Sequence, residues 1–293
     1  MQPATKQPRS RMSVGIVLMC AGVASLCVND AIAKTLTAGY SPIQILFLRN
    51  LIALPFAILI AHRMGGTAAL RSHRPLAHLA RGGLWIGATI LFFTSITYMG
   101  LAEATALIFV APLFITALSA LLFREQVGWR RWLAIAVGFI GVLIAVRPGT
   151  AAFQAISLLP VATAFVYALL MLSARFVDSR ESVWTLLLYM TGTGAALSLF
   201  LVPFVWITPA PEDLWLFAAI AVFGTAGMTM ITQAFRLAPA VVVAPLDYSA
   251  IIWATILGWL FWNEIPDALT FAGAAIIIAS GVFIIVREHR AEG

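Results

Sequence analysis

The fold is decided by a stretch near the C-terminus, RLAPAVVVAPLDYSAIIWATILGWLFWNE (residues 236–264). An earlier stretch, GLAEATALIFVAPLFITALSALLFRE (residues 100–125), has the same order of features: a Leu-Ala pair, an Ala-Pro-Leu triplet, an apolar run and a glutamate. Each stretch is followed by one more apolar run that ends near a glycine, Gly141 or Gly281. This internal similarity predicts a chain built from two related units.

Apolar runs of membrane length fill the chain. Of its 293 residues, 62% are hydrophobic and 10% are charged, whereas an average soluble domain is about 45–50% apolar and about 25% charged. About 20 consecutive apolar residues cross a bilayer as a helix, and continuous rather than alternating hydrophobicity argues against a barrel. The predicted helices cover residues 13–33, 41–61, 79–100, 103–123, 129–147, 154–175, 183–206, 213–236, 241–262 and 267–287.

The basic residues predict the orientation. With the N-terminus in the cytoplasm, fifteen of the 18 Lys and Arg residues fall in cytoplasmic segments. Lys34 and Arg147 lie on the opposite side, and Arg49 lies within the second run. Basic residues flank membrane spans on the cytoplasmic side, so both termini are expected in the cytoplasm of a multi-pass inner-membrane protein. The net charge of +6 is explained in this way, without nucleic-acid binding.

Each unit contains five helices, and an odd number makes the second unit enter the membrane upside down. We therefore expect a cytoplasmic tail at residues 1–12, a first repeat at 13–147, a second, inverted repeat at 154–287 and a cytoplasmic tail at 288–293. Inverted repeats are typical of secondary transporters, whose substrate site lies between the repeats near the midplane. The predicted fold is an all-α integral membrane protein, with ten transmembrane helices as two inverted five-helix repeats around a central cavity. A duplicated scaffold without transport is the alternative.

These features resemble the drug/metabolite transporter superfamily, in its EamA-type ten-helix branch. The resemblance rests on FLRNLIAL (residues 47–54), on the two repeat stretches and on Gly281. The segments NDAIAKTL, QILFLRN and APLDYSAIIWATILGWL are similar to a bacterial subgroup associated with riboflavin or S-adenosylmethionine uptake. Other members of the superfamily export amino acids and related metabolites. The resemblance implies ten helices around a central cavity and no use of ATP, and the sequence has no Gly-rich Lys-Ser/Thr phosphate loop.

Charged residues within the apolar runs are candidates for the site, because a charge near a helix centre costs at least about 2.5–3.5 kcal/mol. Arg49 either anchors an anionic or carbonyl-bearing substrate group or clamps neighbouring helices. Asp30, next to Asn29, either contacts substrate or pairs with Lys34 four residues on.

Asp247 stands where the first repeat stretch has Phe114, two residues after Pro245. Proline has no N–H and can kink or break the helix, which would turn backbone groups toward a cavity. Asp247 is therefore predicted to bind substrate or a coupling proton, with pairing to Arg49 or Arg236 as the alternative.

Other polar and aromatic side chains complete the predicted substrate-binding set. Aromatic rings suit a planar substrate by stacking, although membrane aromatics often face lipid. The remaining predicted residues are Gln44, Asn50, Tyr98, Tyr167, Gln233, Tyr248 and Trp253.

Nothing in the sequence predicts a catalytic residue, a metal site or a cofactor. Three of the four histidines lie in HRMGGTAALRSHRPLAH (residues 62–78), among arginines, and we interpret this segment as a solvated basic loop. The sequence therefore predicts a secondary active transporter that moves a small polar or aromatic metabolite across the inner membrane by alternating access. An exporter of amino acids is the alternative, and a membrane enzyme or a channel is a remote one. The expected partners are the metabolite and the lipid bilayer, and a homodimer is an allowed assembly.

Overall fold

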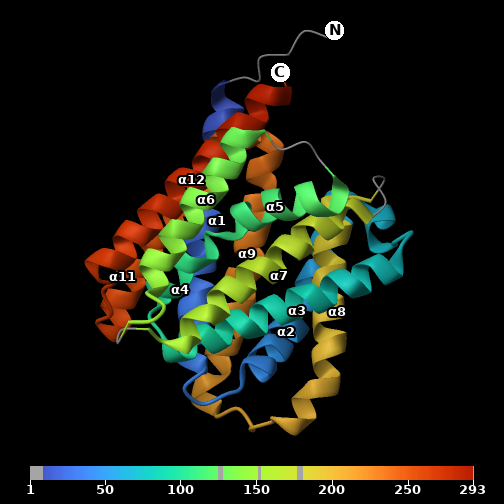
Figure 1. Cartoon of the computed structure of the whole chain (residues 1–293). Coiled ribbons are helices and arrows are strands. Elements are labelled where there is room, and N and C mark those ends of the chain that lie inside the picture. Colours follow the sequence, from blue (N-terminus) through green and yellow to red (C-terminus); the bar gives the residue numbers. More distant parts are fainter. Residues whose placement is uncertain (1–8, 125–127, 151–152, 177–180, 293) are drawn as a thin grey trace, which may run out of the picture.

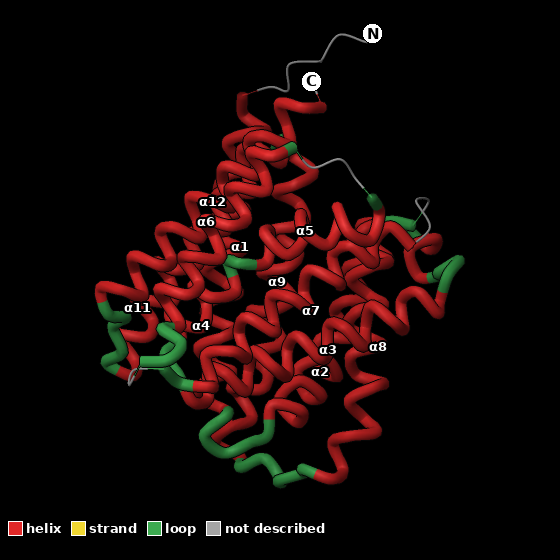
Figure 2. Tube along the Cα trace, in the orientation of Figure 1, coloured by secondary structure: helices red, strands yellow, loops and turns green. Residues whose placement is uncertain are grey.

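The computed structural model describes residues 9–124, 128–150, 153–176 and 181–292. Within these residues all regular structure is helical (Figure 2). Residues 1–8 and Gly293 of the predicted tails, and Glu125 of the first repeat stretch, lie outside the described residues.

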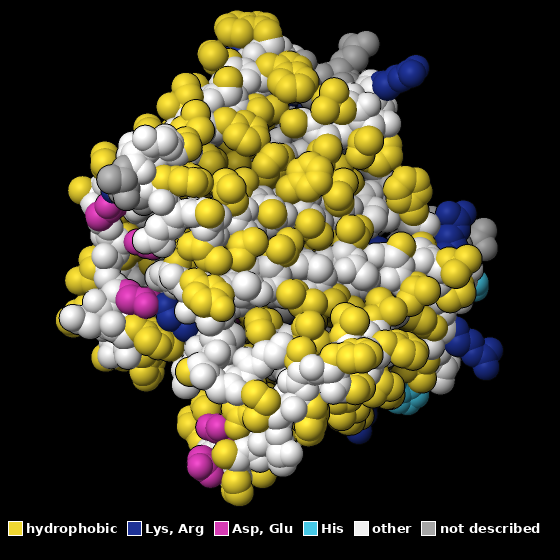
Figure 3. Space-filling model, turned by 60° about the horizontal axis from the view of Figure 1, so that its bottom comes forward, with side chains coloured by type: hydrophobic (Ala, Val, Ile, Leu, Met, Phe, Trp, Pro, Cys, Tyr) yellow, Lys and Arg dark blue, Asp and Glu magenta, His cyan; other side chains and the backbone are white. Residues whose placement is uncertain are grey.

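The described residues contain ten helical spans long and apolar enough to cross a membrane, which confirms the predicted number. Large apolar side chains cover much of the surface (Figure 3), as expected where the solvent is lipid. The spans are formed by α1 (Arg9–Leu36), α2 (Pro42–Gly65), α3 (Pro75–Tyr98), α4 (Leu101–Ile108) with α5 (Ala111–Phe123), α6 (Trp129–Val146), α7 (Leu158–Leu172), α8 (Val183–Leu201), α9 (Leu214–Leu237), α10 (Ala240–Val243) with α11 (Ala250–Trp262), and α12 (Ala268–Glu292).

The helix packing relates the two halves of the chain. Helix α1 packs along α9, and α3 packs along α7. Helix α2 faces α8, and α6 faces α12. If each helix of the first half is replaced by its counterpart in the second half, and the reverse, the α1–α9 contact becomes the α7–α3 contact. The α2–α8 and α6–α12 contacts each join a helix to its own counterpart. This pattern is the one expected of two five-helix repeats.

Two spans are interrupted near their prolines. In the ninth span, the 3-10 segment η6 (Ala244–Ser249) separates α10 from α11 and contains Pro245, so the predicted break is confirmed. A second, unpredicted break separates α4 from α5 just before Pro112. The rings of Phe109 and Tyr248 meet edge to face, with centroids 4.9 Å apart. The two breaks therefore touch each other inside the molecule.

Both termini lie at one end of the molecule (Figure 1), here called the terminal end. At the opposite end, polar contacts join the two halves. Nζ of Lys34 donates to Glu264 at 2.6 Å and to the carbonyl of Met99 at 2.9 Å. The alternative in which Lys34 pairs with Asp30 is therefore wrong. Lys34 meets Glu264 instead because the end of α1 packs against the loop that follows α11.

A second ion pair at the opposite end joins Arg147 to Asp267. The hydrogen bond from Arg147 holds the pKa of Asp267 well below its usual range. Tyr40 adds a third contact, because its hydroxyl donates to Asp213 at 2.7 Å. Acidic side chains gather at this side of the surface, while basic ones gather at the far edge (Figure 3).

The predicted solvated basic loop at residues 62–78 is only partly correct. Helix α3 begins at Pro75, so His78 lies inside a helix. Its side chain is 0% exposed and faces Glu181. Arg81, one turn further along α3, is also buried and donates to the carbonyl of Leu170 at 2.8 Å. Packing of α3 against α7 and α8 removes these groups from water.

Candidate substrate site

A narrow cavity lies among α2, α3, α8 and α9, and we call it the central cavity. Its volume is about 50 Å³, which is room for only a few waters. A metabolite would therefore fit here only if this cavity widened. The lining residues include Arg49, Asn50, Ala57, Ile60 and Ala61 of α2, Trp85 of α3, Trp184, Met190 and Thr191 of α8, and Gly224, Thr225, Met228 and Thr229 of α9.

Arg49 is the cation of the central cavity. Its side chain comes from the middle of α2 and the residue is 8% exposed. Its guanidinium lies 5.9 Å from the centre of the Trp85 ring, and the charge of Asp30 acts on it from α1. Within the described residues it donates no hydrogen bond, although a guanidinium has five N–H donors. A buried cation with free donors is equipped to bind an anionic group.

Gly224 lets α9 approach this cation. A Cβ at this position would lie 2.8 Å from Oδ1 of Asn29 and 3.0 Å from Nη2 of Arg49. Oδ1 of Asn29 is buried without a hydrogen-bond partner, while its Nδ2 donates to Asp30 at 2.9 Å. The structure thus brings Asn29, Asp30 and Arg49 together, as three of the predicted residues.

Asp247 lies in η6, between the helices of both halves. Its charge acts on Cys27 of α1, on Tyr167 of α7 and on the neighbouring Tyr248. The alternative pairing of Asp247 with Arg49 is not found in the described part of the chain, where Asp247 has neither a hydrogen bond nor an ion pair. Arg236 instead places its guanidinium 5.7 Å from the Trp184 ring.

Three other predicted polar and aromatic residues lie inside the molecule. Asn50 lines the central cavity, and its Nδ2 is buried without a partner. Gln44 is buried and uses both ends of its amide on the backbone of Ile207, at 2.6 and 2.8 Å. The hydroxyl of Tyr248 is buried without a partner and faces Gly281.

The last three predicted residues lie away from the central cavity. Gln233 is near the terminal end of α9, with Nε2 3.5 Å from the sulfur of Met64. Tyr98 is 68% exposed at the opposite end, and Trp253 is 38% exposed on α11.

Sequence reasoning missed most of the wall of the cavity. Trp184 was not singled out, because a tryptophan in the first turn of a span normally marks the interface. Thr225 and Thr229 of α9 carry no signal either, since threonine hydroxyls in membrane helices usually bond to their own backbone. Thr229 does donate to the carbonyl of Thr225. Only the small residue at Gly224, within the apolar run, could have suggested a close approach.

The arrangement suits reversible binding. Arg49 contributes a cation to the lining of this cavity, and indole rings and methionine side chains also line it. Such a site can hold an acidic group at one end and an apolar or planar group beside it. Within the described residues, no group of three or more His, Cys, Asp or Glu side chains could hold a metal ion.

Comparison with known proteins agrees with this geometry. Residues 13–147 and 154–287 each match the EamA-like transporter family. An S-adenosylmethionine uptake transporter of Rickettsia prowazekii is 29% identical over 94% of both chains, and a riboflavin transporter of Vibrio cholerae is 30% identical over 91% of both. The pseudopaline exporter CntI of Pseudomonas aeruginosa is 28% identical, over 91% of this chain and 94% of that one.

A solved structure confirms the fold. It is 20% identical in sequence, superimposes with a TM-score of 0.63 and covers 97% of this chain and 99% of its own. Ten apolar helices and two family matches cover nearly the whole chain. The chain therefore belongs to the EamA-like transporter family and is a multi-pass membrane protein.

Proposed function

We propose that this protein is a secondary active transporter that takes up a small metabolite carrying a carboxylate and a planar ring. The observation that carries the proposal is Arg49, a buried guanidinium that donates no hydrogen bond within the described residues and faces the central cavity. A charge-assisted, bidentate contact with a carboxylate would satisfy donors that the protein leaves free.

The cavity walls support the second part of this substrate class. Trp85 and Trp184 present indole rings from α3 and α8, and Met190 and Met228 present polarizable side chains. S-adenosylmethionine, which has both a carboxylate and an adenine ring, fits this description. Riboflavin has a planar ring but no carboxylate, so comparing the transport of the two compounds tests the need for a carboxylate.

Transport would proceed by alternating access between the two repeats. The cavity of about 50 Å³ cannot hold such a substrate, so the halves must separate before binding. In this proposal the terminal end faces the cytoplasm, because the basic side chains gather there. Asp30 and Asp247 are the candidate protonation sites for coupling.

The test is uptake into proteoliposomes of purified protein, with S-adenosylmethionine, riboflavin and amino acids as labelled substrates. Decarboxylated S-adenosylmethionine differs from the first only by the missing carboxylate. We expect it to compete at least about tenfold more weakly, because it cannot use the contact with Arg49. Equal competition by the two compounds would show that Arg49 does not bind the carboxylate. If no solute moved under any gradient, the protein would not be a transporter.

Export is the second candidate direction, since one relative is named as an exporter. A secondary transporter moves its substrate according to the gradients on both sides, so one cavity can serve either direction. Counterflow measured in liposomes of both orientations separates the two. Net uptake that depends on an inward ion gradient would favour import.

A further inference from the structure

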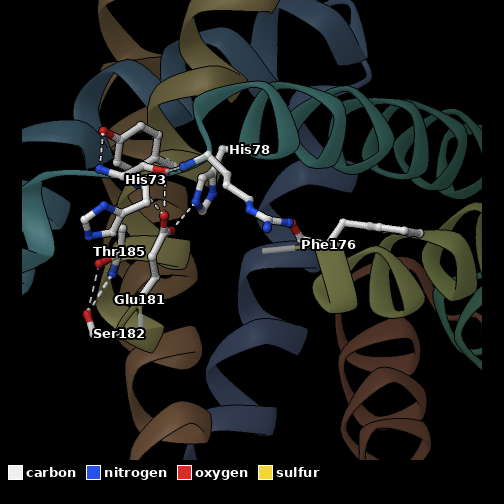
Figure 4. Close-up of polar contacts among 9 residues, drawn as sticks. His73, His78, Phe176, Glu181, Ser182 and Thr185 are labelled. Atoms are coloured by element: carbon white, nitrogen blue, oxygen red, sulfur yellow. Dashed lines mark hydrogen bonds and ion pairs between the residues drawn. The ribbon is translucent and has the colours of Figure 1, made fainter. Parts of the chain in front are cut away.

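A partly buried polar cluster lies between the connection after α2 and the start of α8 (Figure 4). We call it the Glu181 cluster; it consists of Ser72, His73, His78 and Glu181. Oε1 of Glu181 accepts hydrogen bonds from Oγ of Ser72 at 2.7 Å and from the backbone N–H of His73 at 2.6 Å. Oε2 lies 2.5 Å from Nε2 of His78. The side chains of His78 and Glu181 are 0% and 1% exposed.

The cluster ties the first half of the chain to the second. Ser72, His73 and His78 belong to the connection after α2 and to the start of α3, whereas Glu181 comes just before α8. Tyr189 of α8 strengthens the tie, because its ring packs 4.7 Å from that of His78. Its hydroxyl also accepts from the backbone N–H of Ser72 at 3.1 Å.

Glu181 is not needed to start helix α8. Ser182 already caps that helix, and its side chain accepts from the backbone N–H of Thr185 at 3.2 Å. Within the described residues, the hydrogen bonds of Glu181 go to the other half of the molecule. Burial raises the pKa of Glu181, but hydrogen bonds from His78, Ser72 and His73 outweigh it and hold this pKa below its usual value. The carboxylate is thus stabilised in its charged form by the partners that it would lose on separation.

Trp184 follows Glu181 by three residues and lines the cavity. It is 2% exposed and packs against Ala57 and Ala61 of α2, both of which line the cavity. On its other side, the guanidinium of Arg236 lies 5.7 Å from the indole ring. The first turn of α8 therefore sits between α2 and the end of α9, across the way from the cavity to the terminal end.

We propose that Trp184 is the gate of the central cavity at the terminal end, and that the Glu181 cluster is the latch that positions it. This inference rests on the proposed transport function. A substrate leaves toward the terminal end only when the first turn of α8 moves away from α2. That movement must separate a buried carboxylate from three donors, which is costly until water replaces them. Glu181 is accordingly a positioning residue, and Trp184 is the group that blocks the path.

The test measures access to the cavity without any substrate. Cys20 and Cys27 are replaced by serine, and Thr229 of the cavity wall is changed to cysteine. A membrane-impermeant maleimide is then applied from the terminal side to protein in inside-out vesicles. We expect Glu181→Gln to be labelled about tenfold faster, because it loses the charge in these hydrogen bonds. Trp184→Ala should also be labelled faster, with the cluster intact.

Two matched controls separate a latch from general damage. Glu212→Gln makes the same chemical change at an exposed residue of the opposite end. Ser182→Ala removes the cap of α8 and a hydrogen bond to the Thr185 hydroxyl, but leaves the Glu181 cluster intact. Neither should change the labelling rate. If Glu181→Gln does not fold, His78→Gln or Ser72→Ala replaces it in the labelling experiment, because each changes one hydrogen-bond partner of Glu181. Unchanged labelling in folded Glu181→Gln and Trp184→Ala proteins would overturn the inference. Because labelling needs no substrate, it can succeed even if the proposed substrate class fails.

Discussion

At the scale of single residues, the proposed substrate binding depends most on Arg49. A buried guanidinium is normally hydrogen-bonded, because an unpaired buried charge is costly. Arg49 donates no hydrogen bond within the described residues and interacts with the Trp85 ring and the charge of Asp30. We therefore propose that this cation binds a group of the substrate.

The first prediction concerns Arg49. Arg49→Ala should reduce uptake of a carboxylate-bearing substrate at least about tenfold, because a hydrogen bond to a charged group is lost. The thermal midpoint should not fall, since Arg49 has few protein partners to lose. Radiolabel uptake and a melting curve of the same preparation measure both, and Arg49→Lys retains the charge as a control. A large fall in the melting temperature would instead identify Arg49 as a helix clamp.

The second prediction concerns Asp247, which has no hydrogen-bond or ion-pair partner among the described residues. Asp247→Asn keeps the shape and removes the charge, so folding and expression should change little. Uptake should fall several-fold, and its dependence on pH should flatten if Asp247 carries the coupling proton. Flux measured across a pH series checks this. A variant with normal flux and a normal pH profile would exclude Asp247 from the mechanism.

At the scale of the elements, the two interrupted spans matter most. Each break lies at or next to a proline, and Phe109 of one break contacts Tyr248 of the other. The Tyr248 hydroxyl rests directly against Gly281 of α12, where a Cβ would collide with it. A glycine in α12 therefore fixes the position of the break in the ninth span.

The third prediction follows from this contact. Gly281→Ala should displace Tyr248 and destabilise the protein by about 1–3 kcal/mol, as overpacking of a filled site does. Gly83→Ala in α3 is the matched control, because a Cβ there has nothing within 4 Å. Thermal unfolding of both variants in detergent measures the difference. Equal melting temperatures would mean that the Tyr248 side chain moves aside at no cost.

At the scale of the whole molecule, polar contacts join the halves at both ends. The Glu181 cluster acts at the terminal end, and the Lys34–Glu264 pair acts at the other. Lys34 also donates to the carbonyl of Met99 and lies 5.2 Å from the Trp262 ring. Alternating access requires that the two sets of contacts open in turn, not together.

The fourth prediction concerns this opposite end. Lys34→Glu places two acids together and should increase labelling of a Thr229→Cys cavity residue from the opposite side. The double variant Lys34→Glu with Glu264→Lys should restore part of the protection, because the ion pair is rebuilt with reversed polarity. A double-mutant cycle of labelling rates gives the coupling. Additive effects of the two changes would show that the pair does not hold this end closed.

The sequence by itself determined the membrane class and the ten spans, and it predicts their internal repeat. These follow from local physics, because the thickness of the hydrocarbon layer sets the helix length and each helix satisfies its own backbone. The break at Pro245 was predictable for the same reason, since the missing N–H acts within one turn. The break before Pro112 was not anticipated, because proline is also compatible with the first turn of a helix.

Only the tertiary structure decided which polar groups meet. Lys34 joins a glutamate 230 residues away rather than Asp30, and His78 joins Glu181 across 103 residues. Arg49 is predicted from its charge within an apolar run, and Asp247 also from its place after Pro245, but the two do not pair. Trp184 lines a cavity that no motif marks. The physical reason is that the rotation and tilt of each helix are set by packing against its neighbours. Hydropathy predicts that a residue lies in the membrane, whereas helix packing determines which groups it contacts there.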